Sequence, residues 1–290
     1  MTIYRAVPTY RLTLEYDGTR FHGWQVQQNA RSIAGELQRA LVDAGCDVVE
    51  LGGSGRTDAG VHALAQVAHL RLRGRRDPER LRRELNDRLP PDVHVLAVAA
   101  AAERFHARHD AVSRSYLYQL ATRRTAFHKR FVWWVKKPLD VDAMRAAAAV
   151  LVGRHDYHAF CERPREQTST LVEVEHVDVV AAESLVLVRI VASHFLWKMV
   201  RRVVGALVRV GWGELDQAAL AGLVAPGSGQ HAGAVGGAVK GGGVKGGQGD
   251  GGPAEWTAPP SGLFLERILY AGEEPLAPVA PATPVRLPPR

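Results

Sequence analysis

Apolar and polar residues alternate in several short stretches of the chain, with the period of two that half-buried β-strands show. The first such stretch, TYRLTLEYD at 9–17, is also rich in β-branched and aromatic residues. Elsewhere apolar residues recur at helical spacing, as in SIAGELQRALVDA at 32–44, where Ser32 stands at the N-cap position. Together these patterns predict strands at 9–17, 48–51, 63–72, 92–101, within 105–120, at 171–180 and at 184–192, and helices at 32–44, 78–88, 140–152 and 194–210.

The predicted elements occur twice in a comparable order, which indicates two α+β halves. We assign the N-terminal half to 1–105 and the C-terminal half to 106–271. Within the second half, residues 226–253 contain 13 glycines in 28 positions, so this segment cannot bury enough apolar surface to offset its backbone entropy. We expect a disordered insertion there, and a flexible tail in the Pro- and Ala-rich segment 272–290.

The charge of the chain favours polyanionic partners. A formal net charge of +7 and a pI near 9.7 attract nucleic acid or an anionic membrane surface. No stretch approaches the roughly 20 apolar residues that cross a bilayer, and the N-terminus has no apolar signal-peptide core. These features predict a soluble cytoplasmic protein without a membrane partner.

Residues that bind metals are too sparse in the sequence to predict a metal site. The two cysteines, Cys46 and Cys161, form no CxxC pair and cannot build a disulfide framework. Histidines lie three apart at 106–109 and at 155–158, but neither pair has further ligands nearby in the sequence. No bound metal is therefore expected.

The most informative segment for function is GSGRTDAGVHALAQVAHL, at 53–70. It places the guanidinium of Arg56 and the carboxylate of Asp58 two residues apart on a glycine-flanked loop, and glycines let the backbone approach a ligand. An aspartate at a loop tip is ordinarily a turn residue, so Asp58 alone does not establish catalysis. The GK[ST] of a phosphate-binding P-loop does not follow, which argues against nucleotide binding. His62 is expected to structure the loop through hydrogen bonds.

The nine residues GRTDAGVHA, at 55–63, closely resemble the catalytic loop of the tRNA pseudouridine synthase A family. Further segments resemble motifs of this family in the same order: EYDGTRFHGWQ at 15–25, RFHARHDAVSRSYLYQL at 104–120, SHFLWKMVRRVVGALVRVG at 193–211 and the closing strand PPSGLFLERILY at 259–270. The resemblance covers 9–225 and 254–271, and the glycine-rich insertion between them is the main departure.

The resemblance implies an α+β fold of the pseudouridine synthase type, in which two ferredoxin-like halves with a joined antiparallel sheet enclose a central catalytic cleft. It also implies an isomerase that converts uridines 38–40, in the anticodon stem and loop of tRNA, to pseudouridine. The family works as a homodimer in which one tRNA contacts both subunits through its anticodon arm. Breaking the N1–C1′ bond, turning the base and forming a C5–C1′ bond involves no net redox change, so no cofactor is expected.

By the same resemblance, Asp58 is the nucleophile or its equivalent and Arg56 helps to flip the target nucleotide. Arg201 matches the arginine that pairs with the catalytic aspartate, and Tyr116, in preference to Tyr118, matches the tyrosine on which the uracil stacks. From the residues alone, spacing favours a solvent-facing position for Arg201 and a core position for Tyr116, and the family pattern reverses both. An ionised aspartate in a partly dry pocket nevertheless needs a cation to offset its desolvation, and an arginine supplies one.

Phosphate contacts are expected from basic loops, because structured RNA is recognised through its shape and backbone. His106 and Arg108 match an RNA-contacting segment of the family. Arg124, Arg163 and Arg165 lie in basic stretches of weaker correspondence, and we expect them to face RNA as well.

Two other functions fit the same sequence. A noncatalytic RNA-binding module keeps the fold and the basic surface without isomerising uridine, although intact Asp58, Arg56, Tyr116 and Arg201 count against it. A synthase of the same family with a different RNA target carries the same motifs, because these motifs report chemistry rather than substrate address.

Overall fold

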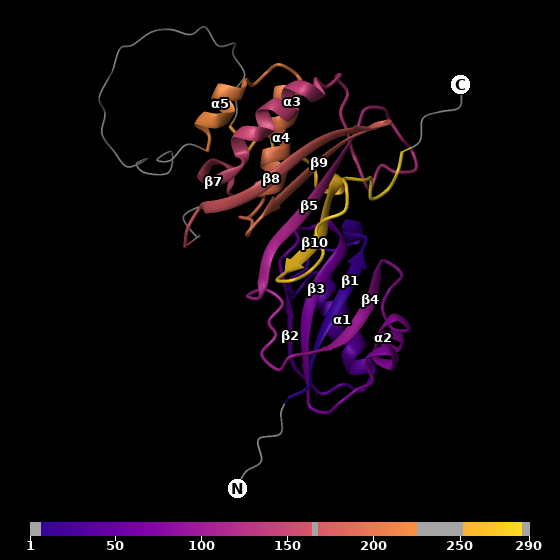
Figure 1. The fold of residues 1–290 in the computed structure, drawn as a ribbon. Coiled ribbons are helices and arrows are strands. Elements are labelled where there is room, and N and C mark those ends of the chain that lie inside the picture. Colours follow the sequence, from indigo (N-terminus) through magenta and orange to yellow (C-terminus); the bar gives the residue numbers. More distant parts are fainter. Residues whose placement is uncertain (1–6, 164–167, 225–251, 286–290) are drawn as a thin grey trace.

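A mixed sheet of ten strands runs through both halves of the structure (Figure 1). The computed structural model describes residues 7–163, 168–224 and 252–285. In Figure 1 the N-terminal half, in indigo and purple, lies below the C-terminal half, and the yellow C-terminal strand lies between them. The α+β class predicted from the sequence is confirmed.

The N-terminal half has the element order βαββαβ. Its elements are β1 (Thr9–Tyr16), α1 (Ile33–Asp43), β2 (Val48–Gly53), β3 (His62–Leu72), α2 (Pro78–Asn86) and β4 (Val93–Ala101), with a short 3₁₀ helix at Gly18–Arg20. The strands pair antiparallel in the order β4-β1-β3-β2, as in a ferredoxin-like unit. Both helices bury apolar side chains in the core, among them Leu37 of α1 and Leu85 of α2.

The C-terminal half repeats this plan and adds short elements. Its main elements are β5 (Ala111–Ala121), α3 (Val141–Ala148), β8 (Leu171–Ala182), β9 (Leu185–Ala192), α4 (Met199–Gly211) and β10 (Leu263–Tyr270). The additions are β6 (Trp133–Trp134), β7 (Gly153–Asp156), α5 (Gln217–Gly222) and 3₁₀ helices at Ala149–Leu151, His158–Phe160 and Pro260–Gly262. The strand order β10-β5-β9-β8 matches that of the first half, so the two halves share one topology.

The two halves join where β3 meets β10. β10 pairs in parallel with the first residues of β3, through Phe264↔His62 and Leu265↔Ala63, and the rest of that edge of β3 pairs with β2. On its other side β10 pairs antiparallel with β5. The four main strands of each half thus pair antiparallel, as expected, while the pair that joins the halves is parallel, as is the short pair of β5 with β6. The junction brings the loop before β3 to the boundary with the second half.

The helix expected from residue 194 begins instead at Met199. The preceding segment is irregular, and Lys198, at the N-cap, has a left-handed backbone with a φ of 61°. Leu196 is buried although it is not helical, so its apolar side chain extends the helical pattern beyond the helix. The four-residue β7 and the six-residue α5 were not predicted, because such short elements carry too little periodicity.

Residues 272–285, for which composition predicted a flexible tail, lie against the sheet in the structure. The Oε1 of buried Gln119 accepts the backbone N–H of Ala282 at 2.8 Å. The backbone carbonyl of Ala277 accepts a hydrogen bond from Nη1 of Arg189, also at 2.8 Å. These bonds hold the segment beside β5 and β9.

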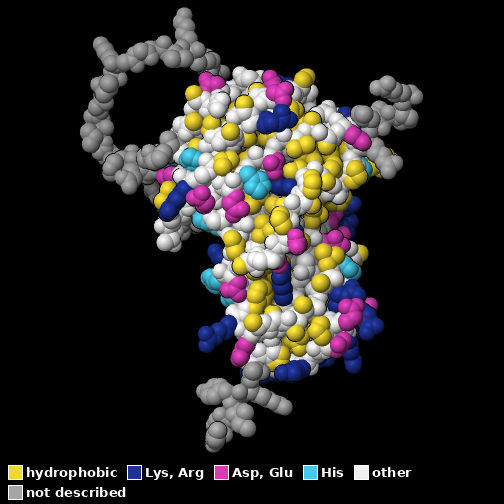
Figure 2. Space-filling model, in the orientation of Figure 1, with side chains coloured by type: hydrophobic (Ala, Val, Ile, Leu, Met, Phe, Trp, Pro, Cys, Tyr) yellow, Lys and Arg dark blue, Asp and Glu magenta, His cyan; other side chains and the backbone are white. Residues whose placement is uncertain are grey.

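Two expectations fall outside the described residues: Arg165, and the glycine-rich insertion 226–253 except for its last two positions. Among the helices that the structure describes, none is both long enough and apolar enough for a membrane span. On the face drawn in Figure 2, Lys and Arg side chains are spread over the N-terminal half and its margins, with Asp and Glu among them. The positive charge on that face is dispersed rather than gathered in one patch.

Candidate active site

Asp58 lies on the loop between β2 and β3, which packs against the segment that follows β1. Trp24 donates its backbone N–H to Thr57 O at 3.1 Å, and the Tyr16 and Thr57 hydroxyls share a hydrogen bond of 2.9 Å. Gly23 has a φ of 92°, and a Cβ at that position would lie 2.4 Å from Thr57 O. Glycine is therefore required at position 23 for the two loops to approach each other.

His62 ties the end of this loop to two further segments. Its Nδ1 accepts the backbone N–H of Gly18 at 3.1 Å, and its Nε2 donates to Arg130 O at 2.9 Å. The ring stacks on Phe264, with the two ring centroids 4.8 Å apart. Because the imidazole is buried and both of its nitrogens are engaged, His62 structures the loop, the role expected from the sequence.

The carboxylate of Asp58 faces the start of α4. Its Oδ2 lies 3.7 Å from Nη1 of Arg201, and 27% of its side chain is exposed. Burial raises the pKa of Asp58, whereas the charges of Arg201 and Lys198 and a hydrogen bond from Trp197 lower it, and the net pKa lies above the ordinary value. A loop of the N-terminal half thus meets a helix of the C-terminal half at a carboxylate–guanidinium pair.

Arg201 is held in place by the segment before β10. Its Nε donates to Ala258 O at 2.7 Å, and its own backbone carbonyl accepts the Ala258 N–H at 3.0 Å. Burial lowers the pKa of Arg201, and the neighbouring Asp58 raises it, with a net value below the ordinary one. An arginine nevertheless stays charged in a protein, so the structure places a fixed cation beside Asp58.

Trp197 and Lys198, just before α4, belong to this site and were missed by the sequence analysis. The Nζ of Lys198 lies 3.2 Å from Oε1 of Glu162. Glu162 also pairs with the buried Arg202 of α4 and donates its backbone N–H to Trp197 O at 2.9 Å. Lys198 has a positive φ, a backbone conformation that costs a non-glycine residue roughly 1–3 kcal/mol and persists only where the surroundings impose it. The sequence feature that could have identified Trp197 and Lys198 as site residues was their position inside the SHFLWKMVRR segment.

Tyr116 of β5 lies at the same site, with 8% of the residue exposed. Its ring meets that of Phe195 edge-on, with centroids 4.9 Å apart. Burial raises the pKa of Tyr116 the most, and neighbouring negative charge, including that of Asp58, raises it further, so the phenol stays protonated. Tyr118 is fully buried and donates its hydroxyl to Pro259 O at 2.7 Å. The structure therefore places Tyr118 in the core and Tyr116 within electrostatic reach of the carboxylate.

Arg56, expected to help flip the nucleotide, and the expected RNA-contacting arginines that the structure describes all lie on exposed loops. Arg56 is exposed on the loop between β2 and β3, and Arg108 and Arg124 are exposed on the loops before and after β5. The exposed Arg163 lies over the ring of Trp197, 5.3 Å from its centroid, which brings it close to the start of α4. These positions suit contact with phosphate groups.

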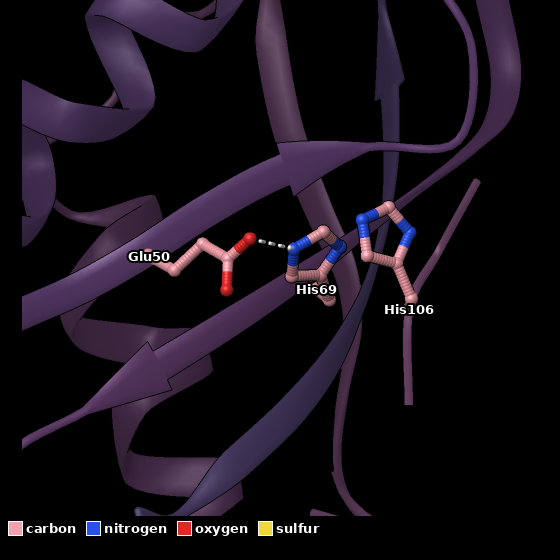
Figure 3. A group of neighbouring side chains, drawn as sticks. All are labelled: Glu50, His69 and His106. Carbon is pink, nitrogen blue, oxygen red and sulfur yellow. Dashed lines mark ion pairs between the residues drawn. The ribbon is translucent and has the colours of Figure 1, made fainter. Parts of the chain in front are cut away.

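His106, the other expected RNA contact, lies in a cluster with Glu50 and His69 (Figure 3). Nε2 of His69 lies 3.2 Å from Oε1 of Glu50, and the ring centroids of His69 and His106 are 4.4 Å apart. Backbone N–H groups donate to Nδ1 of both histidines, from Ala107 to His69 and from Arg108 to His106, each at 3.2 Å.

These hydrogen bonds do not fit a metal centre. A neutral imidazole whose Nδ1 accepts an N–H carries its proton on Nε2, so the Nε2 of His69 that faces Glu50 is a donor rather than a metal ligand. A metal-bound histidine instead donates from its second nitrogen. Glu50 is also paired with Arg71 at 2.7 Å. The cluster is best described as a hydrogen-bonded support for the segment that carries His106.

The arrangement around Asp58 can do covalent or acid–base chemistry on a flat ligand. A carboxylate can attack an electrophilic carbon or take a proton. Arg201 and Lys198 offset the cost of desolvating its negative charge. The ring of Tyr116 supplies an aromatic surface of the kind on which nucleobases stack.

The profile of the tRNA pseudouridine synthase family matches residues 13–110 and 147–240. The chain is 38% identical over 273 residues to tRNA pseudouridine synthase A of Nitrobacter winogradskyi, covering 93% of this chain and 98% of that protein. It is 42% identical over 213 residues to the protein of the same name from Rhizobium meliloti, covering 72% and 86%. For the Aquifex aeolicus protein of that name the identity is 35% over 265 residues, covering 91% and 100%. The chain therefore belongs to the tRNA pseudouridine synthase family.

Proposed function

We propose that the protein isomerises uridines 38–40 in the anticodon stem and loop of tRNA, with Asp58 as the nucleophile. As a member of its family it is an isomerase that converts uridine to pseudouridine in tRNA. The observation that carries the role of Asp58 is its carboxylate, held 3.7 Å from the guanidinium of Arg201 where the two halves meet. A desolvated carboxylate with a raised pKa and a specific charged partner is typical of a catalytic group.

The reaction begins when the target uridine leaves its stack, which costs a few kcal/mol. In this proposal Arg56, which is exposed on the loop two residues before Asp58, helps to flip the nucleotide. The ring of Tyr116, fixed edge-on against Phe195, then supports the base by stacking.

With the nucleotide in place, the Asp58 carboxylate attacks C1′ or removes a proton from the sugar, and the N1–C1′ bond breaks with its electron pair going to the uracil. The freed uracil turns so that C5 faces C1′ and forms the new bond. As this bond forms, the Asp58 carboxylate leaves C1′ or, where it had removed a proton from the sugar, returns that proton, so the aspartate is restored. C5 then loses its proton and N1 gains one, which gives pseudouridine as an isomer of uridine. Arg201 favours the ionised form of Asp58 at the start and the end of this cycle, because its charge partly offsets the desolvation of the carboxylate.

The proposal includes the partners implied by the family. These are the anticodon arm of tRNA and a second copy of the chain, with one tRNA contacting both subunits in the cytoplasm. The net charge of +7 supports a polyanionic substrate. A noncatalytic RNA-binding module is a weaker account, because burying an aspartate against an arginine costs desolvation free energy that RNA binding alone does not require.

Mapping of pseudouridine in tRNA transcripts tests the proposal. A carbodiimide adduct on pseudouridine stops reverse transcriptase, so each modified position appears as a stop. Transcripts with uridine at 38, 39 and 40 are incubated with the protein beside matched transcripts that carry cytidine there. We expect stops at 38–40 only in the first set. Stops elsewhere would indicate a different RNA target, and their absence from every tRNA would leave the RNA-binding module.

A further inference from the structure

The loop between β5 and β6, residues 122–132, combines positive charge with an exposed aromatic ring. From 111 to 139 the chain contains seven Lys and Arg residues and no Asp or Glu. Phe127 is 89% exposed, more than any other large apolar side chain in the part of the chain that the structure describes. A phenyl ring held in water on a basic loop contributes nothing to the core, and beside cations it offers a surface of the kind on which nucleobases stack.

The loop rests on a fixed base. Phe131 O accepts from the side-chain amide of Gln119 at 2.8 Å, and Phe131 donates its N–H to His128 O at 2.8 Å. The backbone carbonyl of the buried Val132 accepts a hydrogen bond from the hydroxyl of Ser261 at 3.2 Å. The exposed ring therefore projects from an anchored segment, which reduces the entropy cost of ordering the loop on binding.

The base of the loop lies close to the candidate active site. The Arg130 carbonyl accepts the hydrogen bond from His62 at 2.9 Å, and the Arg130 guanidinium lies 3.5 Å from Asp17. His62 follows Asp58 by four residues, which limits the separation of their Cα atoms to about 14 Å. A strand of RNA with one nucleotide at Asp58 therefore comes within a few nucleotides of this loop.

A pocket lies beside the exposed ring. It has a volume of about 550 Å³, opens to solvent and is lined by residues 123–128 together with Pro284. On the same loop the Arg124 guanidinium lies 5.8 Å from the ring centroid of the exposed Trp134. Aromatic rings interleaved with cations bind unpaired nucleotides, because the rings stack on bases and the cations attract phosphates.

We propose that this loop, 122–132, binds an unpaired nucleotide of the tRNA, with its base stacked on Phe127 and its phosphates beside Arg124 and the neighbouring cations. The inference rests on the proposed function, because it takes tRNA as the occupant. The run of positive charge without a carboxylate favours a polyanion over a protein partner, whose interface is depleted of charge at its centre.

Equilibrium binding of a fluorescently labelled tRNA transcript to the full chain tests this inference. The variants are Phe127→Ala, Phe127→Trp and, as a matched control, Val42→Ala, which removes another exposed apolar side chain. Losing one base–aromatic stack is expected to raise Kd about tenfold in Phe127→Ala. Phe127→Trp keeps a stacking surface, so it and the control are expected to bind like the wild type.

An unchanged Kd in Phe127→Ala would overturn the inference. A weaker dimer in sedimentation, with tRNA binding intact, would overturn it too and make the loop a contact between two copies of the chain. Binding and turnover are measured separately. If the wild type binds tRNA but forms no pseudouridine, the proposed function fails while the comparison at Phe127 still decides where tRNA binds.

Discussion

Replacing Arg201 by Met is expected to slow the reaction most at low pH. The positive charge of Arg201 lies 3.7 Å from the Asp58 carboxylate and lowers the pKa that burial raises. Without that charge the pKa of Asp58 rises further, so at a given pH a larger share of the enzyme carries a protonated, unreactive aspartic acid. The acid limb of the pH–rate profile therefore moves to higher pH in Arg201→Met.

The size of the effect follows from the geometry. Two unit charges 3.7 Å apart interact by about 4 kcal/mol at an effective dielectric constant of about 20. Lys198 and the hydrogen bond from Trp197 remain beside the carboxylate in the variant, and 27% of the Asp58 side chain is exposed. We therefore expect a loss of about half this interaction, about 2 kcal/mol. At pH values below the pKa of Asp58, this corresponds to a rate about 30-fold lower than that of the wild type. At pH values high enough to ionise Asp58 in the variant, its rate is expected to return to that of the wild type.

Single-turnover rates with excess enzyme, measured across the acid and neutral pH range, check this expectation. Arg209→Met is the matched control, because Arg209 lies on the same helix and pairs with Glu214 at 3.0 Å. A rate loss that is equal at every pH, with the acid limb unmoved, would refute the reasoning. Arg201 would then act on substrate binding or on the transition state rather than on the ionisation of Asp58.

Substitutions at two further positions test the surroundings of the pair. Glu162→Gln is expected to lower the free energy of unfolding by about 1.5–3 kcal/mol, because the buried Arg202 guanidinium loses a charged partner. Burial raises the pKa of Glu162, but Lys198 and Arg202 lower it to a net value below the ordinary one, so this stabilisation is present at neutral pH and lost on acidification. Thermal unfolding at neutral and acid pH measures the difference, and an equal loss at both would contradict the argument. Tyr116→Phe keeps the ring and is expected to retain kcat/KM, whereas Tyr116→Ala is expected to reduce it about tenfold. Steady-state assays of both variants, with circular dichroism as the folding control, decide this point, and equal losses would assign the role to the hydroxyl.

Elements whose causes lie within a few residues could be predicted from the sequence. Ser32 caps α1, with its hydroxyl accepting the Gly35 N–H at 3.3 Å. Asp77 caps α2, whose first position is Pro78. The N-terminal end of each of these two helices could be predicted, because a capping residue directly precedes an apolar repeat in the sequence.

Contacts between distant segments could not be predicted in this way. The apolar repeat runs through Leu196 into α4, and only the contacts of Lys198 with Glu162 show why the helix begins later. Residue spacing also does not reveal that Arg201 faces the loop that carries Asp58 while the next arginine, Arg202, pairs with Glu162. Arg201 was identified through its resemblance to a family motif, because its partner comes from the other half of the molecule.

The most direct test of the central claim is tritium release from tRNA transcribed with 5-tritiated uridine, because the label leaves when C5 forms its bond to C1′. The wild-type chain and Asp58→Ala are compared at enzyme concentrations that saturate the tRNA, with binding measured in parallel. We expect the wild type to release tritium, and Asp58→Ala to bind tRNA and release none. Release by Asp58→Ala at the wild-type rate would contradict the assignment of Asp58 as the nucleophile.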